Sequence, residues 1–236
     1  PELEAAPEPA RPAGNQETET GMFRSPGGAV ALVLVVSVLL GAVALDAHAQ
    51  DRPDALELYR DGRYERAIEV TLEEIEEQPR NMDAYTVLGW SLLALGRYED
   101  ALEYGLNAME ISRFDARIIY IVGEAHRYLD NFEESLSYLE EYVAVAPNGR
   151  QVHQVYYNMG EVFLELEEYN HADAALSTAV HFDDDRASWW SRLGVAREQA
   201  GDYEHAEEAY ERALELDQDL DEASEGLERV REELEG

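Results

Sequence analysis

The stretch Gly201-Asp-Tyr-Glu-His-Ala206 is one of five similar segments in this chain of 236 residues. Gly96-Arg-Tyr-Glu-Asp-Ala101 and Gly62-Arg-Tyr-Glu-Arg-Ala67 repeat its order of turn residue, aromatic residue and small residue. The aromatic members follow one another at steps of 34, 34, 37 and 34 residues; they are Tyr64, Tyr98, Phe132, Tyr169 and Tyr203. A 34-residue period predicts stacked helix-turn-helix units rather than a single globular core.

Each unit from the second onward carries large residues at helical spacing ahead of its turn. Tyr156, Met159 and Phe163 lie at i, i+3 and i+7, which places them on one face of a helix. A glycine follows the middle member of this set in four units, and it allows the neighbouring helix to approach closely; these are Gly89, Gly123, Gly160 and Gly194. Pro79 and Pro147 end two of the second helices, because proline cannot continue a helix.

This pattern resembles the tetratricopeptide repeat, whose skeleton is W-x2-L-G-x2-Y with later Ala, aromatic and Pro positions. The last unit matches it best, through Trp190, Leu193, Gly194, Gly201, Tyr203, Ala206 and Tyr210. Arg197 replaces the Tyr of its first helix, and Gln218 replaces the closing Pro. The resemblance covers about 48–220. It implies an all-α fold, a right-handed α-solenoid of about five helix-turn-helix repeats with a C-terminal capping helix.

The repeats are expected over about 50–81, 82–115, 116–152, 153–186 and 187–220. The first unit is irregular, with a first helix shortened to about Pro53–Arg60 and Ala55 at the small position. The 37-residue step places three extra residues most simply in the loop 147–152. A polar-faced capping helix is expected over 221–235, with an apolar stripe formed by Leu227, Val230 and Leu234.

The charge balance excludes several functions. The chain has 52 acidic and 18 basic residues, and the basic residues are all Arg. Nucleic acids and anionic membrane surfaces need a basic stripe, so they are not expected partners. The absence of Lys removes lysine chemistry, and the absence of Cys removes disulfides, thiol nucleophiles and lipidation on cysteine. The acidity has two open explanations, solubility and adaptation to high salt.

The N-terminal part has the composition of an export signal. Residues 1–21 are rich in Pro, Glu and Ala and are expected to be disordered. Within 22–49, Arg24 precedes the apolar run Ala29–Leu45 and an Ala-x-Ala ending at Ala49. We favour a signal cleaved after Ala49, with an uncleaved signal anchor through 29–45 as the alternative. Either places the repeats outside the cytoplasm, in the periplasm or on the outer face of the inner membrane. Met22 could be the true start, which leaves the origin of 1–21 open.

Catalytic and metal-binding patterns are not found in the sequence. The six histidines lack metal-ligand spacing, and His126 occupies a position that usually holds a core aromatic. The run Asp217-x-Asp219-x-Asp221 has Glu222 at the sixth position, where a calcium loop needs Gly. There is no phosphate-cradling loop and no nucleophile elbow. We therefore expect no enzymatic activity, no cofactor and no metal site.

The resemblance implies that the first helices line a concave groove for a peptide or protein segment. Arg117 and Arg127 lie one row apart there, and a carboxylate or acidic segment could sit between them. The alternative is that the tyrosines pack on neighbouring repeats and the arginines pair with nearby glutamates. The groove positions are rich in Tyr, Trp and Arg, the residues typical of interface hot spots; they are Tyr59, Arg60, Trp90, Leu93, Arg117, Tyr120, Glu124, Arg127, Tyr128, Gln154, Tyr157, Glu161 and Leu164.

These observations favour a non-catalytic scaffold or adaptor of the cell envelope that binds a protein or peptide partner in its groove. Two alternatives stay open. One is a small-ligand or solute-binding component associated with a transporter, and the other is a self-associating structural solenoid, which would make the protein a homo-oligomer. Membrane contact is expected only through 29–45, if that run is not cleaved.

Overall fold

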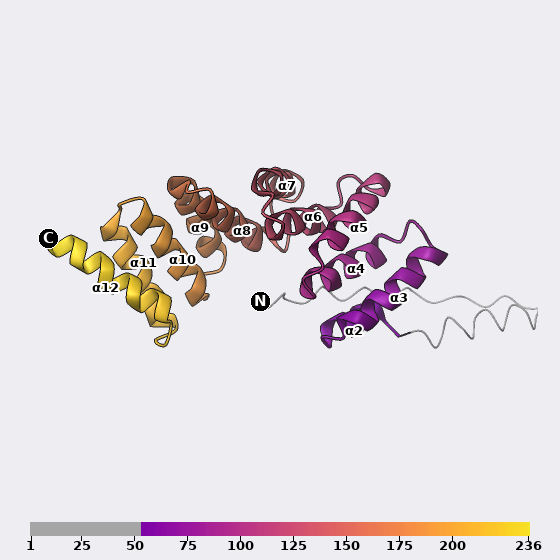
Figure 1. Cartoon of the computed structure of the whole chain (residues 1–236), viewed down its shortest axis with the longest axis horizontal. Helices are drawn as coiled ribbons and strands as arrows, with labels where there is room; N and C mark the ends of the chain where they lie inside the picture. The colour runs from indigo at the N-terminus through magenta and orange to yellow at the C-terminus, as the bar shows by residue number, and fades with distance from the viewer. Residues whose placement is uncertain (1–52) are drawn as a thin grey trace, which may run out of the picture.

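The computed structural model describes residues 53–236, and this part of the chain contains eleven helices and no strand. The expected all-α solenoid is confirmed (Figure 1). The expectations for 1–21 and 22–49 lie outside the described residues. The helices are α2 (Ala55–Arg60), α3 (Tyr64–Glu77), α4 (Met82–Ala94), α5 (Tyr98–Ile111), α6 (Ala116–Tyr128), α7 (Phe132–Val145), α8 (Val152–Glu165), α9 (Tyr169–Phe182), α10 (Ala187–Gln199), α11 (Tyr203–Leu216) and α12 (Asp221–Glu235).

The helices form five antiparallel pairs, α2–α3 to α10–α11, which we call units one to five, followed by α12. In Figure 1 the second helices α5, α7 and α9 lie along the upper edge, with the first helices α4, α6 and α8 below them. In units one, two and five, the turn between the first and second helices contains a glycine with positive φ, such as Gly96 at 71°. Asp130 and Glu167 take the same left-handed conformation in units three and four, at 57° and 59°. The turn geometry is therefore kept even where the residue type does not favour it.

The extra residues of the 37-residue step lie between α7 and α8. Here the connection is 146–151, whereas units two and three are joined by the shorter connection 112–115. Helix α8 also has 14 residues, against 13 in α6. The extra residues of the 37-residue step therefore lengthen the connection and add one residue to the start of α8. This agrees with the placement of the insertion at 147–152.

Glycines in the first helices set the distance between neighbouring helices. A Cβ atom on Gly89 would lie 2.8 Å from side-chain atoms of Ile121, and one on Gly160 would lie 2.5 Å from Leu176 Cγ. A β-carbon at either position would force the partner side chain to move. The close packing of the solenoid therefore depends on this small position, which recurs once in each unit.

Helix α12 packs as a further first helix. Its buried residues are Ala223, Gly226 and Val230, and a Cβ atom on Gly226 would lie 2.3 Å from the ring of Tyr210. The expected stripe is wrong at Leu234, which is 42% exposed, because the helix turns its Ala223–Gly226–Val230 face to unit five instead. Among the described helices, none is long and apolar enough to cross a membrane.

Substitution of Gly226 by Val should destabilise the docking of α12. The added side chain meets the buried ring of Tyr210, and such overpacking costs about 1–3 kcal/mol. Chemical unfolding followed by circular dichroism measures this cost. Ser224→Val, at an exposed position of the same helix, is the matched control and should change stability much less. Equal stability of the two variants would contradict the packing of α12 described here.

Candidate functional site

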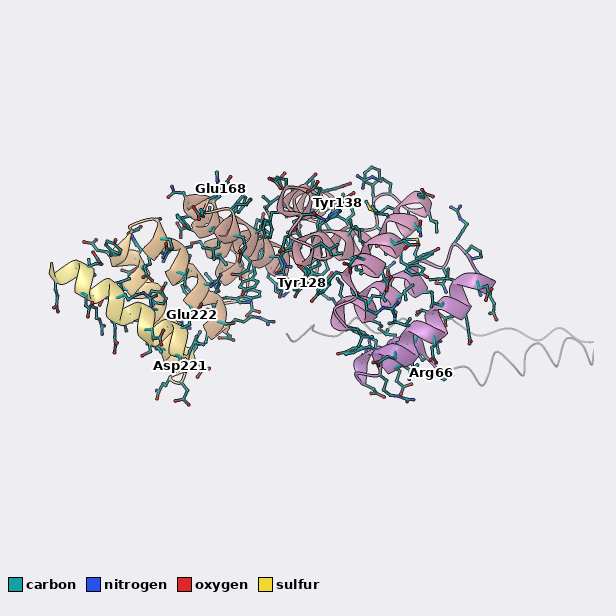
Figure 2. The ribbon with its side chains drawn as sticks, viewed as in Figure 1. Arg66, Tyr128, Tyr138, Glu168, Asp221 and Glu222 are labelled. Atoms are coloured by element: carbon teal, nitrogen blue, oxygen red, sulfur yellow. The ribbon has the colours of Figure 1, made fainter. Side chains whose placement is uncertain are left out.

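We call the side of the solenoid formed by α4, α6, α8, α10 and α12 the first-helix face. In Figure 2, Tyr128, Glu222 and Asp221 lie on the lower side of the molecule, where these helices run. Tyr138 and Glu168 lie on the upper side, which belongs to the second helices. The first-helix face contains most of the groove positions selected from the sequence.

Four of those positions are buried, and one of them, Glu124, belongs to a polar network. The other three are core residues and offer no contact surface. Tyr59, Leu93 and Tyr120 are 7%, 8% and 1% exposed, because the neighbouring helices cover them. Burial raises the pKa of Tyr59 to about 12, with a smaller contribution from Tyr64. The expectation that these side chains themselves contact a partner is corrected: they hold adjacent units together.

Trp90 lies at the N-terminal end of the face, and Arg60 precedes it on α2. Trp90 is partly buried and packs against Tyr59, with ring centroids 5.7 Å apart. Its Nε1 is the one buried side-chain nitrogen or oxygen of residues 53–236 that lacks a hydrogen-bond partner. Arg60 is exposed at the end of α2.

A buried hydrogen-bond network joins α6 to α8. Asn158 Nδ2 donates to Glu124 Oε1 at 2.5 Å and to Tyr120 Oη at 3.3 Å. Gln154 Nε2 donates to Asn158 Oδ1 at 3.0 Å, and Arg127 Nε donates to Glu124 Oε1 at 3.0 Å. Asn158 is 1% exposed and Glu124 is 6% exposed, so these bonds form in a medium of low dielectric constant. We call these five residues the α6–α8 network.

Arg127 connects this network to the surface. Its guanidinium carbon lies 4.0 Å from the ring centroid of Tyr128, which is 39% exposed. Tyr128 in turn stacks on Tyr98, with centroids 4.4 Å apart and planes at 6°. Burial opposes the charge of Arg127, but the adjacent Glu124 carboxylate outweighs it and raises the pKa of the guanidinium. The result is an exposed aromatic edge that packs between Arg127 and Tyr98, beside the Arg127–Glu124 ion pair.

Arg117 does not stand ready to bind a partner's carboxylate. Its Nε and Nη2 donate to Asp115 at 3.0 and 2.7 Å, and its Nη1 donates to Asp83 on α4 at 2.6 Å. Arg127 is held by Glu124. The hypothesis of an acidic segment between these two arginines is therefore not favoured, because each already has carboxylate partners. The alternative, in which the arginines pair with nearby glutamates, holds for Arg127 with Glu124, whereas Arg117 pairs with the aspartates Asp115 and Asp83.

Arg192 links three first helices at the other end of the face. Its Nε donates to Glu161 on α8 at 2.8 Å, and its Nη1 donates to Glu222 on α12 at 3.1 Å. Ser191 Oγ donates to the second oxygen of Glu222 at 2.7 Å. Beside them, Tyr157 stacks on Trp189 at 4.8 Å. Burial, with added repulsion from Glu161, raises the pKa of the Tyr157 hydroxyl, so this tyrosine stays neutral. Leu164 is partly buried on the same helix, in the core of units four and five.

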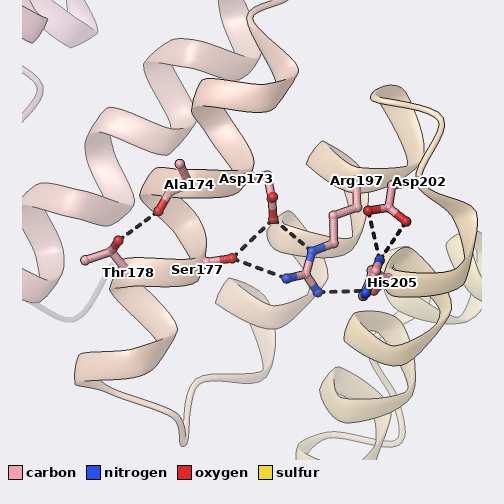
Figure 3. Close-up of polar contacts among 7 residues, drawn as sticks. All are labelled: Asp173, Ala174, Ser177, Thr178, Arg197, Asp202 and His205. Carbon is pink, nitrogen blue, oxygen red and sulfur yellow. Dashed lines mark hydrogen bonds and ion pairs between the residues drawn. The ribbon is translucent and has the colours of Figure 1, made fainter.

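Arg197, which replaces the aromatic residue of the repeat pattern, connects two second helices, α9 and α11. Figure 3 shows Arg197 reaching from α10 to α9, where its Nε donates to Asp173 at 2.8 Å and its Nη2 donates to Ser177 at 3.3 Å. Its Nη1 donates to the carbonyl of His205 on α11 at 3.2 Å. Asp202 accepts from His205 Nδ1 at 2.8 Å. The polar contacts of Arg197 thus replace the apolar contacts that an aromatic ring would make at this position.

Sequence reasoning missed Asn158 and Arg192, although a signal for both was present. Both lie two residues before the first-helix glycine of their unit, where units two and three have Val87 and Ile121. A polar residue at a position that is otherwise apolar indicates a partner across the helix interface. Aligning the units on Gly160 would have brought the two residues together.

The expectation about metal sites concerns the His, Asp and Glu side chains of the described residues. No group of three or more His, Asp or Glu side chains in 53–236 is placed to hold a metal ion. Asp217 instead accepts a hydrogen bond from the backbone nitrogen of Asp219 at 3.1 Å, as part of the connection before α12. The first-helix face instead carries aromatic side chains and arginines that are bound to carboxylates.

Replacing Asn158 by Leu, of similar size, should destabilise the protein by about 1–3 kcal/mol. The change removes both donors and leaves the buried Glu124 carboxylate with Arg127 as its remaining partner in the α6–α8 network. Urea unfolding measures the loss. Asn170→Leu, at an exposed position of α9, is the control. If both variants unfold at the wild-type midpoint, the network makes no net contribution to stability.

Glu198 should make the docking of α12 dependent on pH. It accepts bonds from Arg229 Nε at 2.7 Å and from Tyr210 Oη at 2.6 Å. Burial acts to raise the pKa of Glu198, but the bonds from Arg229 and Tyr210 outweigh it and lower the pKa below 4.5. A lowered folded-state pKa means that the stabilisation is present above pH 4.5 and is lost as the pH falls through the folded-state value.

Glu198→Gln should therefore be less stable than the wild type at neutral pH, and the difference should vanish in acid. Unfolding midpoints measured from pH 7 to pH 2 test this. Glu204→Gln, at an exposed position of α11, serves as the control. A stability difference that stays constant across the series would contradict the assigned role of Glu198.

Models of the tetratricopeptide repeat match this chain in three places, over 54–116, 153–185 and 187–220. Among curated proteins, the BBSome complex member BBS4 of Bos taurus is 25% identical over 187 residues, covering 66% of this chain and 36% of that protein. The protein O-mannosyl-transferase TMTC1 of Homo sapiens is 24% identical over 188 residues, covering 74% of this chain and 21% of that protein. The chain thus spans little more than a third of the length of these relatives, or less.

Solved structures share the fold. A MamA structure aligns with a TM-score of 0.62 and 20% identity, over 70% of this chain and 95% of its own. MamA from Desulfovibrio magneticus RS-1 aligns with a TM-score of 0.62 and 22% identity, over 71% and 93%. YrrB, described as a TPR protein with an unusual peptide-binding site, aligns with a TM-score of 0.62 and 19% identity, over 70% and 84%.

Together the matched ranges include more than half of the chain, and they agree in phase with the helix pairs of units one, two, four and five. The chain belongs to the tetratricopeptide repeat family.

Proposed function

We propose that this protein is a non-catalytic scaffold of the cell envelope that binds a segment of another protein on its first-helix face. The observation that carries the proposal is the exposed Tyr128 edge, fixed between Arg127 and Tyr98 in the middle of that face. A side chain already held in place loses little conformational entropy on binding, which favours its use as an anchor. The tetratricopeptide fold supports a protein-binding role in general, and the related fold of YrrB is described with a peptide-binding site.

The charges support a partner segment that carries Arg or Lys. The whole chain has a net charge of −34, and both Arg117 and Arg192 are bound by two carboxylates. Asp83 keeps 83% of its side chain exposed beside Arg117. A cationic segment would be attracted to this face, and its affinity would fall as salt screens the charges.

The cell-envelope location rests on the sequence before the described residues. Arg24, the apolar run 29–45 and the Ala-x-Ala ending at Ala49 have the order of an export signal. N-terminal sequencing of the protein recovered from an envelope fraction tests this part. A mature start near Gln50 indicates cleavage, a retained apolar run indicates an anchor, and recovery only from the cytoplasm contradicts export.

The binding surface is tested by cross-linking capture from the envelope fraction, identification of the captured protein, and titration of the purified pair. The double variant Tyr128→Ser with Asp83→Asn should bind about tenfold more weakly or worse, because it removes an aromatic anchor and an exposed carboxylate. The control variant Phe114→Ser with Glu168→Gln changes an exposed aromatic in an inter-unit connection and an exposed carboxylate on the second-helix side. Equal losses in the two variants would place the binding site elsewhere.

A further inference from the structure

Asn158 breaks the pattern of the interface between first helices. Its position corresponds to Val87 and Ile121 in units two and three, where the contact is apolar. A buried amide is costly unless its hydrogen-bonding groups find partners. Both Nδ2 hydrogens of Asn158 and its carbonyl oxygen have partners, on α6 and on α8 itself. The surrounding side chains therefore satisfy the hydrogen-bonding groups of the Asn158 amide.

The buried apolar residues of 53–236 form four clusters, and one boundary between them falls at the same place. The larger cluster of buried residues begins in α3 and ends at Val155, in the first half of α8. A second cluster begins at Ala172 and continues through α9, α10 and α11. Apolar contact of buried α8 residues with units one to three is thus confined to Val152 and Val155. The partly buried Tyr156 and Met159 of α8 also pack against this cluster, and the α6–α8 network adds the buried polar contacts.

The lengthened connection 146–151 is tied to the same network. Tyr142 Oη accepts a hydrogen bond from the backbone nitrogen of Gln151 at 3.3 Å. The ring of Tyr142 lies edge-on to Tyr120, with centroids 6.2 Å apart. Gly149 has to lack a side chain here, since its Cβ would lie 2.5 Å from Tyr142 Oη. The insertion, the connection and Asn158 therefore form one connected junction between units three and four.

We infer that Asn158 is the positioning residue that fixes the angle between the two halves of the solenoid, α2–α7 and α8–α12. Its amide nitrogen donates to two acceptors on α6, Glu124 and Tyr120, which lie one helical turn apart. Two directional bonds to separate points on a helix define its orientation, whereas apolar contacts allow sliding. A carboxylate at this position would donate nothing and would repel Glu124.

The consequence for a partner rests on the proposed function. Glu124 bonds both Asn158 and Arg127, and Arg127 stacks on Tyr128. A change at Asn158 would therefore alter both the curvature of the first-helix face and the placement of its central aromatic edge. The angle itself can be measured without any partner, so the two proposals can fail separately.

The test is a distance measurement between the two halves of the full-length chain. The protein contains no cysteine, so Glu99→Cys on α5 and Glu204→Cys on α11 accept spin labels at two equivalent, exposed positions. Double electron–electron resonance then gives the distribution of label distances. The wild-type background should give one narrow population. Asn158→Asp should broaden it or add a second population, because the two buried carboxylates repel.

Three comparisons decide the outcome. Asn170→Asp, the same substitution at an exposed position of α9, should leave the distribution narrow. Asn158→Asp combined with Glu124→Gln restores an amide–carboxylate pair with the roles exchanged, and should restore the narrow distribution. If Asn158→Asp alone does not fold, Asn158→Ser, too short to reach both acceptors, should show the same broadening. An unchanged distribution in a folded Asn158 variant, or equal broadening by Asn170→Asp, would overturn the inference.

Discussion

The close contact between each first helix and the helices packed beside it is the constraint on which this structure depends. A helix pair of 34 residues cannot bury its apolar face alone, so each unit is stabilised by its neighbours. Glycines such as Gly89 and Gly160 bring the helices close enough for large side chains to interlock. Helix α12 follows the same rule by placing Gly226 against Tyr210 of α11. A small residue at this position therefore recurs along the chain, while the chemistry of the contacts between first helices changes.

The buried contacts between successive first helices change from apolar to polar at the junction of units three and four. Between α4 and α6 the contact is made by residues such as Ile121, which is fully buried. From α6 onward, Glu124 bonds Asn158, and Glu161 and Glu222 share Arg192. Buried polar contacts are directional and costly to leave incomplete, so they specify geometry more strongly than apolar contacts do. From α6 onward the first helices are thus joined by specific bonds, and Arg127 and Arg192 already have carboxylate partners in them.

Much of the fold could be predicted from the sequence because a 34-residue period leaves few alternatives. The regular spacing of Tyr98 and its equivalents indicates the units. The one longer spacing, of 37 residues, indicates which two units the insertion separates. The roles of individual side chains were harder to predict. Within one repeat, a residue that faces the groove has the same sequence spacing as a residue that the next helix covers. Tyr120 has the spacing of a surface aromatic but is 1% exposed. The partners of Arg117 and Arg192 lie on other units, and a residue's own repeat does not reveal them.

We expect the polar junction to divide the solenoid into two halves, α2–α7 and α8–α12, that open separately. Native-state hydrogen exchange, resolved helix by helix, measures this opening. Two groups of amide protons are expected, one from each half, with different opening free energies and a boundary near 146–155. A single opening free energy shared by all helices from α3 to α11 would contradict it.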